Sequence, residues 1–180
     1  GVSRNSTNEA GDRPPLWRDV LLRGIERCPA PHREMKQLLN AGDLLTCCQL
    51  VRYRMGHNWV PFLENEFLHP NFQHHEIHRH IFDLDSSVIL TPNFDKIYDN
   101  YAIATGGNKV RIKKHHDNDI GRSIRGPLCT RLILKVHGCI DTPNELVFTR
   151  EDYADARVKY EGFYRAIDAL IMTHTFVFLG

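Results

Sequence analysis

The chain has 180 residues, which suits one domain and is long enough to bury a sizeable core. Its 23 basic and 22 acidic residues nearly cancel, so the composition gives no general attraction to nucleic acid or to anionic membranes. No apolar run approaches the roughly 20 residues of a membrane-spanning helix. We therefore expect neither a membrane nor a nucleic acid among the partners of this domain.

The first half of the chain predicts helices after a polar start. Residues 1–14 are polar and loop-like, and a helix is expected to begin near Pro15 and to end at Pro29 and Pro31. Apolar residues at helical spacing predict further helices: one or two over 32–56 with a break at 40–43, and shorter ones over 60–69 and 73–83. This helical block, about 32–84, is expected to be an insertion that packs as a lid or small subdomain.

The second half predicts alternating strands and helices. Ser87–Leu90 and 130–137 are short β-branched runs that end in polar residues, which is typical of buried parallel strands. A basic strand is expected over 108–116, whose charges would protect a sheet edge rather than contact a nucleic acid. The other expected elements are a helix after residue 95, a loop or helical turn over 117–127, a strand at 146–148, a helix with Thr149 as N-cap and Asp152 in its first turn, a helix over 161–173 and a strand over 175–179. These elements predict an α/β fold, with a parallel sheet flanked by helices and a helical insertion.

The cysteines are odd in number and form no Cys-x-x-Cys pair: Cys28, Cys47, Cys48, Cys129 and Cys139. This pattern argues against a disulfide framework and against a four-cysteine zinc site. We expect buried free thiols, as in a reducing compartment, and therefore a cytoplasmic protein.

A histidine-rich segment, 74–80, invites a metal-binding interpretation. It lacks the His-Glu-x-x-His spacing, since Arg79 stands where the second histidine would be. His74 and His78 are four residues apart, but the segment identifies no third ligand. We expect a solvated helix face here and no metal site.

Polar residues follow two of the expected strands directly. The segment Thr91–Asp95 (TPNFD) follows the first, and His137 and Gly138 follow the apolar run Leu132–Val136 of the second. Ligands of open parallel sheets bind outside the carboxyl ends of the strands. An asparagine, an aspartate and a histidine are therefore expected in one cleft.

These segments resemble parts of sirtuins. Thr91–Asp95 resembles their T-Q-N-x-D segment, and Val136–Gly138 resembles the segment with their catalytic His-Gly pair. Gly1–Ser3 resembles the end of the G-A-G-x-S loop that opens the NAD site, and Phe176–Gly180 resembles the strand and glycine that begin the adenosine-binding turn. The four segments occur in the family's order, so the resemblance implies a Rossmann-like, NAD-binding domain over residues 1–180. Because the first and last segments match only parts of their motifs, we expect a chain truncated at both ends.

The chain departs from protein-deacylating sirtuins in two ways. It lacks the Cys-x-x-Cys pairs of their zinc module, and Pro92 replaces the glutamine of their motif. It is more similar to the zinc-free sirtuin-like domains of bacterial anti-phage defence proteins, a group associated with NAD hydrolysis. The resemblance implies an NAD hydrolase that depletes NAD in abortive infection, as a homo-oligomer or under the control of a sensor domain or partner protein.

The resemblance assigns the catalytic roles to His137 and Asn93. His137 is the expected general base, since an imidazole accepts a proton near neutral pH; the alternative is a core histidine bonded to a backbone carbonyl. Asn93 would hydrogen-bond the nicotinamide ribose or the attacking water; the alternative is an N-cap for a helix that starts near Phe94. Asp95 would accept a hydrogen bond from the nicotinamide carboxamide or orient the loop, or face a helix dipole as a first-turn acid.

The expected contacts with NAD, which is the substrate, are Gly1, Val2, Ser3, Thr91, Asn93, Asp95, Gly138 and Gly180. Ser3 would bond a phosphate oxygen, and Gly180 would contact the adenosine ribose. Arg4, Asn5 and Arg13 are weaker candidates in the N-terminal stretch.

Two other functions remain as alternatives. A sirtuin-like fold that only senses NAD or ADP-ribose, or that scaffolds an assembly, has no need for a base such as His137. A protein deacylase would release nicotinamide only in the presence of an acylated peptide.

Overall fold

The computed structural model describes residues 1–117, 119–125 and 131–179, so the expectations for Cys129 and Gly180 lie outside the described residues. The elements in chain order are η1 (Val2–Asn5), α1 (Trp17–Arg27), α2 (Arg33–Ala41), α3 (Leu44–Met55), η2 (Gly56–Asn58), α4 (Trp59–Phe67), α5 (Glu76–Asp83), β1 (Val88–Thr91), α6 (Ile97–Gly106), η3 (Gly107–Lys109), β2 (Val110–Lys114), α7 (Ile120–Arg125), β3 (Arg131–Lys135), η4 (Pro143–Glu145), α8 (Arg150–Lys159) and α9 (Glu161–Thr173).

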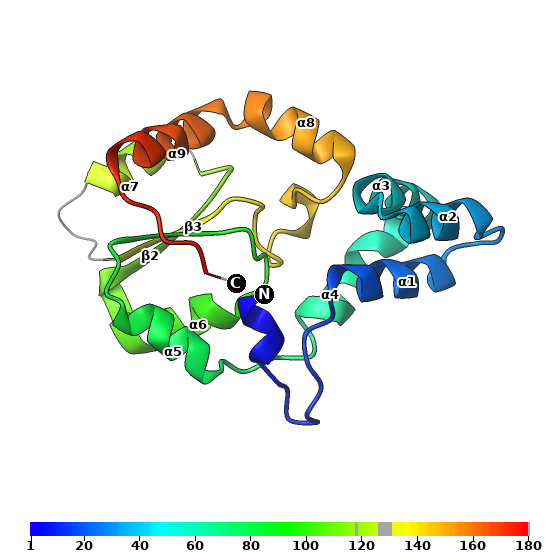
Figure 1. Ribbon diagram of the computed structural model, residues 1–180, viewed down its shortest axis with the longest axis horizontal. Helices are drawn as coiled ribbons and strands as arrows, with labels where there is room; N and C mark the ends of the chain where they lie inside the picture. Colours follow the sequence, from blue (N-terminus) through cyan, green and yellow to red (C-terminus); the bar gives the residue numbers. More distant parts are fainter. Residues whose placement is uncertain (118, 126–130, 180) are drawn as a thin grey trace.

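Three parallel strands form a sheet in the order β1-β3-β2. The central strand β3 places Ile133 opposite Ile89 of β1 and Ile112 of β2. Helices α7 and α9 cover one face, and α5 and α6 cover the other (Figure 1). The predicted α/β class, a Rossmann-like parallel sheet flanked by helices, is therefore confirmed, and the basic strand β2 lies at an edge of the described sheet.

The side chains of β3 alternate between these two layers, as they must in an extended strand. Leu132 and Leu134 pack into an apolar cluster with residues of α7 and α9. On the other face, the guanidinium of Arg131 lies 3.6 Å from the ring centroid of Phe82 in α5. The Lys135 side chain lies on the same face of the sheet as Arg131 and points toward α6. It places a charge in the helical layer near the end of β1.

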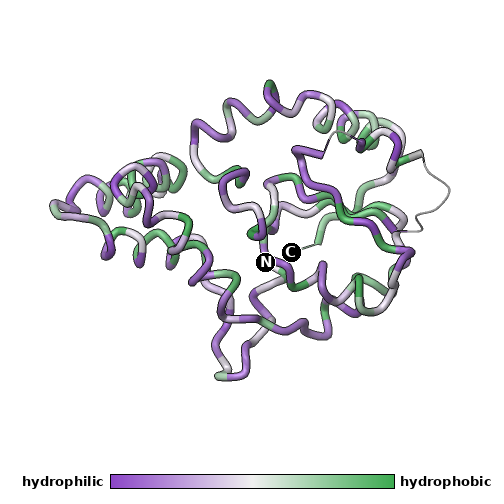
Figure 2. The backbone as a smooth tube through the Cα atoms, turned by 180° about the vertical axis from the view of Figure 1, so that it is seen from behind, coloured by the Kyte–Doolittle hydropathy of each residue, from purple (hydrophilic) through white to green (hydrophobic). Residues whose placement is uncertain are grey.

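Helices α1–α4 form a separate helical lobe beside the sheet, and Figure 2 shows it projecting away from the α/β part. Its core includes Met35, Cys47, Cys48 and Val51, none of which is exposed to solvent. The expected break between α2 and α3 falls at Gly42, whose φ of +80° is a conformation that glycine adopts without a Cβ clash.

The helices expected within 32–84 divide between two places. Helices α2 and α3 pack against α1, whereas α5 packs against α6 under the sheet. The sequence therefore locates the helices, and the boundary of an insertion over about 32–84 stays a prediction.

Two expected strands do not occur among the described residues. Residues 146–148 pair with no strand, and their apolar character is explained by burial against the lobe, where Phe148 stacks on Trp17 with 4.7 Å between ring centroids. Residues 175–179 form no ladder either, and Val177 and Phe178 are 77% and 89% exposed. Local β propensity predicts a strand, but a neighbouring backbone must supply the hydrogen bonds.

The histidine-rich segment matches the expected solvated helix face in part, because Glu76, Arg79 and His80 are exposed on α5 whereas His78 is not. Helix α5 begins only at Glu76, so His74 precedes it and does not share a helical face with His78. His78 is fully buried, with its ring centroid 6.3 Å from that of Tyr98. His74 packs on Tyr101 at 4.4 Å. Both rings serve aromatic packing beneath the sheet.

The described cysteines are free and buried, as expected: Cys28, Cys47, Cys48 and Cys139. Burial is the main cause that raises the pKa of Cys47 to about 11, so this thiol stays protonated at neutral pH. None of the described helices is both long enough and apolar enough to cross a membrane.

Candidate active site

The two polar segments that follow β1 and β3 lie side by side at one edge of the sheet. The amide of Val136 donates to the carbonyl of Thr91 at 3.0 Å, which continues the β1–β3 pairing past the last strand residue. The amide of Ile140 donates to the carbonyl of Phe94 at 2.8 Å. These two hydrogen bonds fix the Thr91–Asp95 segment against the turn at His137 and Gly138.

Ser3, Asn93 and Asp95 form one chain of side-chain hydrogen bonds. The Asn93 Nδ2 donates to Ser3 Oγ at 2.8 Å, and that hydroxyl donates to Asp95 Oδ2 at 2.7 Å. The N-terminal segment is therefore held against the end of β1 by residues about ninety positions away. Three of the expected NAD contacts are brought together, and the Asn93 amide is fixed in one orientation.

The structure distinguishes the alternative interpretations of Asn93 and Asp95. Helix α6 begins at Ile97, so Asn93 is too far upstream to be its N-cap, and that alternative is wrong. Asp95 Oδ1 instead accepts from the amide of Ile97 at 3.0 Å, the contact expected of an acid at a helix start. The backbone N–H of Asn93 donates to Thr91 Oγ1 at 3.1 Å, which tightens the turn.

A buried lysine supports this turn from below. Lys135, the last residue of β3, has no exposed surface, and its ammonium donates to Asp99 Oδ2 at 2.6 Å and to the carbonyl of Asp95. Burial raises the pKa of Asp99, and the nearby Lys135 ammonium opposes that rise. Removing either partner would leave the other charge without compensation in the interior.

His137 follows β3 and is partly buried between the end of β1 and α8. Its ring nitrogen Nε2 lies 3.2 Å from the hydroxyl of Tyr153, and the two rings meet edge to face. Burial lowers the pKa of His137 below its usual value near 6.5, although a hydrogen bond to the backbone of Pro92 opposes this shift. The imidazole is therefore neutral at pH 7, as a general base must be.

Gly138 makes the turn after His137 possible. Its φ is +86°, and a Cβ at this position would lie 2.9 Å from His115 Cε1 and 3.1 Å from the carbonyl oxygen of Glu145. Both observations require glycine, the first because of backbone strain and the second because of space. The Thr91–Asp95 segment and the Gly138 turn are thus each fixed by specific local contacts.

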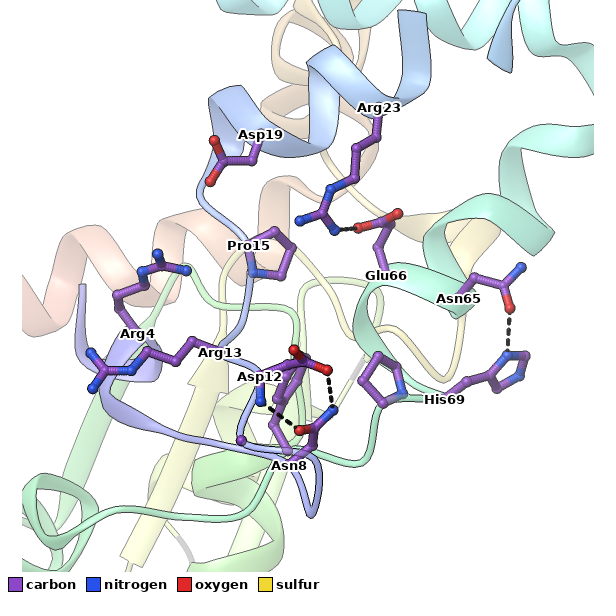
Figure 3. Close-up of a pocket in the computed structure, with 13 residues that line it drawn as sticks. Arg4, Asn8, Asp12, Arg13, Pro15, Asp19, Arg23, Asn65, Glu66 and His69 are labelled. Carbon is purple, nitrogen blue, oxygen red and sulfur yellow. Dashed lines mark hydrogen bonds and ion pairs between the residues drawn. The ribbon is translucent and has the colours of Figure 1, made fainter. Parts of the chain in front are cut away.

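A polar hollow of about 800 Å³ opens between the N-terminal segment, α1 and α4 (Figure 3). Arg4, Arg13 and Arg23 line it, together with Asp12 and Glu66. Figure 3 shows Arg4 and Arg13 close to each other on one side, while Arg23 pairs with Glu66 at 2.6 Å on the other. Asn93 and His137 do not line this hollow; it adjoins the site through Arg4, the neighbour of Ser3.

The remaining expected contacts lie around η1. Gly1 is exposed and forms the N-cap of η1, and its carbonyl accepts from the amide of Arg4 at 3.0 Å. Val2 is partly buried, and Asn5 is exposed.

Three residues of the site were missed by the sequence analysis: Lys135, Asp99 and Tyr153. Lys135 carries a signal, because it is the one charge within the apolar run Leu132–Val136 and therefore needs a buried partner. Asp99 and Tyr153 reach the site only through tertiary packing.

Comparison with known proteins gives a family match and a similar curated protein, each over part of the chain. A protein-family model described as SIR2-like domain matches residues 87–180, just over half of the chain. NAD(+) hydrolase ThsA of Acinetobacter baumannii (strain 532279) is 25% identical over 103 residues, which cover 57% of this chain and 20% of that protein. The aligned region therefore spans about a fifth of the relative's length. The family match includes both polar segments at the sheet edge and leaves out Ser3 and the polar hollow.

Proposed function

The chain belongs to the SIR2-like domain family, and on this premise we propose that it is an NAD hydrolase that releases nicotinamide and ADP-ribose. One observation carries the proposal: a neutral, partly buried His137 lies at the same sheet edge as an Asn93 whose orientation is fixed. The name of the relative, NAD(+) hydrolase, supports the same reaction class.

His137 acts in this proposal as the general base. The bond between the anomeric carbon and the nicotinamide nitrogen breaks, its electron pair goes to nicotinamide, and a water oxygen bonds the anomeric carbon. The proton of that water passes to the imidazole. Because nicotinamide is cationic within NAD and leaves as a neutral molecule, no acid is needed to protonate it.

Asn93 positions the water or the ribose hydroxyl. Its Nδ2 donates to Ser3, so its Oδ1 is directed as an acceptor toward an O–H group of the reactants. Asp95 is already bonded to Ser3 and to the start of α6. We assign Asp95 the role of orienting the loop, in preference to binding the carboxamide.

The remaining parts of NAD are assigned to the N-terminal segment. Arg4 and Arg13 line the polar hollow next to Ser3, and their guanidinium groups suit the two phosphates. Gly1, Val2, Thr91, Gly138 and Gly180 complete the proposed contacts. We further propose that domain 1–180, with its helical insertion, depletes NAD in anti-phage defence under the control of a sensor, a partner or its own oligomerisation.

The test is nicotinamide release from NAD by the protein and by two variants, Asn93→Ala and His137→Ala. We expect each variant to lose about 10²–10⁴-fold in kcat, the usual range for a general acid–base residue or its partner. His80→Ala is the matched control, because His80 is an exposed histidine on α5 and should leave release unchanged. Turnover that survives in both variants would contradict the proposal.

Added acetylated peptide separates the deacylase alternative. A hydrolase releases nicotinamide without the peptide, whereas a deacylase requires it. Binding of NAD without release under any condition would support a sensor or scaffold instead.

A further inference from the structure

A second group of polar side chains lies at the sheet edge, on the turn that follows β2. The amide of Lys114 donates to Asp117 Oδ2 at 2.8 Å, and the amide of Asp117 donates to the carbonyl of Lys114 at 3.0 Å. His115 and His116 are the two central residues of this closed turn. Neither histidine takes part in the proposed cleavage of NAD.

Glu145 reaches the same point from the loop before α8. It ends η4, and the loop is tied to β2 because the Lys114 ammonium donates to Asp141 Oδ1 at 2.6 Å. Ligand atoms of His115, His116 and Glu145 all lie within 4.8 Å of one another. Two imidazoles from one turn and one carboxylate from another loop therefore converge. Each of these two segments is held in place by its own hydrogen bonds.

Among the described residues, three ring nitrogens of this group are buried without a hydrogen-bond partner, although only His115 is a fully buried residue. His115 is 1% exposed, and neither of its ring nitrogens has a partner among the described residues; the same holds for His116 Nδ1. The centroid of the His115 ring lies 4.3 Å from that of Tyr160 and 5.2 Å from that of His116. Leaving buried polar nitrogens unsatisfied is unfavourable, so a ligand for them would be stabilising.

We propose that His115, His116 and Glu145 bind a divalent transition metal ion of the zinc class. Two histidines and a carboxylate are the donor set of three-ligand zinc sites, which keep a fourth position for water. Donors at about 2.1 Å from one ion in tetrahedral geometry lie about 3.4 Å apart, so donor atoms that are now up to 4.8 Å apart need to approach by at most about 1.4 Å. In the structure, Glu145 Oε2 accepts a hydrogen bond from the Tyr160 hydroxyl. The same oxygen lies 3.5 Å from the Lys159 ammonium.

The ion would act as a clamp behind the turn at Gly138. His115 and the backbone of Glu145 are the two nearest of the three groups that a Cβ on Gly138 would meet, so the metal ligands pack directly on this turn. Fixing them would hold the turn that carries His137. Binding of the metal and its effect on stability do not depend on the proposed cleavage of NAD.

The test is titration of the chelator-treated protein with Zn²⁺ by calorimetry, with thermal unfolding followed in parallel. We expect one equivalent to bind with micromolar or tighter affinity and to raise Tm, because a ligand that binds only the folded state stabilises it by mass action. His116→Ala and Glu145→Gln should each weaken binding at least tenfold. His80→Ala removes an exposed histidine of the 74–80 segment and should leave the affinity unchanged.

Co²⁺ absorption of the unmodified protein provides a second measurement that does not depend on the folding of a variant. We expect d–d bands of a nitrogen- and oxygen-ligated ion without a thiolate charge-transfer band. A thiolate band would assign the metal to the buried cysteines. That result, the absence of stoichiometric binding, or an affinity unchanged in both ligand variants would overturn the proposal.

Discussion

The turns that follow β1 and β2 lie at the same edge of one sheet, on either side of β3, yet their polar side chains are satisfied in opposite ways. In the first turn, the side chains of Asn93 and Asp95 both bond to Ser3. Asp95 also accepts from the backbone amide of Ile97, and a buried lysine donates to its carbonyl. In the second, His115 is packed among aromatic rings, with no hydrogen bond to its nitrogens in the part of the chain that is described.

The difference shows two ways of preparing a site. The polar side chains of the first turn have hydrogen-bond partners in the protein, so they keep fixed orientations and can position a substrate without rearrangement. The second turn holds three ring nitrogens that have no hydrogen-bond partner within the described residues, so an ion that binds to them would stabilise it.

Lys135→Met should break the support of the first turn. It leaves the carboxylate of Asp99 buried without its partner, and we expect the free energy of unfolding to fall by about 3–5 kcal/mol. Urea denaturation measures this change. Lys159→Met is the control, because the Lys159 side chain is 63% exposed and solvent screens its ion pair. A loss in Lys135→Met no larger than in the control would mean that the buried pair does not support the turn.

Gly138→Ala should disturb both turns, because Gly138 lies between them. The left-handed backbone costs about 1–2 kcal/mol for alanine, and the contact with His115 adds to it, so we expect about 2–3 kcal/mol of destabilisation. Thermal unfolding measures the effect. In Gly162→Ala, where the added Cβ meets no atom within 4 Å, we expect no loss. Equal Tm values for the two variants would contradict the geometry of this turn.

Ser3→Ala should loosen only the first turn. It removes the hydroxyl that joins Asn93 to Asp95, and we expect about a 10–100-fold drop in kcat with a loss of stability near 1 kcal/mol. Ser87→Ala, at an exposed serine before β1, is the control. The effect should appear in kcat more than in KM. If only KM changes, Ser3 contacts NAD directly and does not orient Asn93.

The pH dependence of activity should follow His137. Burial lowers its pKa, so the folded protein resists protonation and the neutral base persists below pH 6.5. Because the pKa of His137 is lower in the folded than in the unfolded protein, the stability that comes from a neutral His137 is present above pH 6.5 and is lost as the pH falls below 6.5. We expect the acidic limb of kcat/KM to have its midpoint below 6.5. A midpoint above 6.5 would indicate another titrating group.

The sequence predicts those parts of the site that depend on local pattern. Short β-branched runs followed by polar residues locate the ends of β1 and β3, and parallel strands necessarily deliver those ends to one edge. Asn93 and His137 were foreseeable for this reason. The cap at Thr149, which accepts from the amide of Asp152 at 3.1 Å, was foreseeable from its spacing.

Parts that depend on tertiary contacts could not be predicted in this way. Asp99 pairs with Lys135 across 36 positions of sequence, and only the register of β3 over α6 brings them together. His115 and Glu145 converge because two loops meet behind Gly138. Residues 175–179 have strand-like composition but no backbone partner among the described residues, which no local pattern reports.

The most direct test of the central claim separates binding from chemistry at His137. NAD binding by calorimetry and nicotinamide release are measured side by side for the protein and for His137→Ala. We expect the variant to keep its affinity within a few-fold and to lose at least about 100-fold in turnover. A variant that still binds NAD and releases nicotinamide at the original rate would show that the base lies elsewhere.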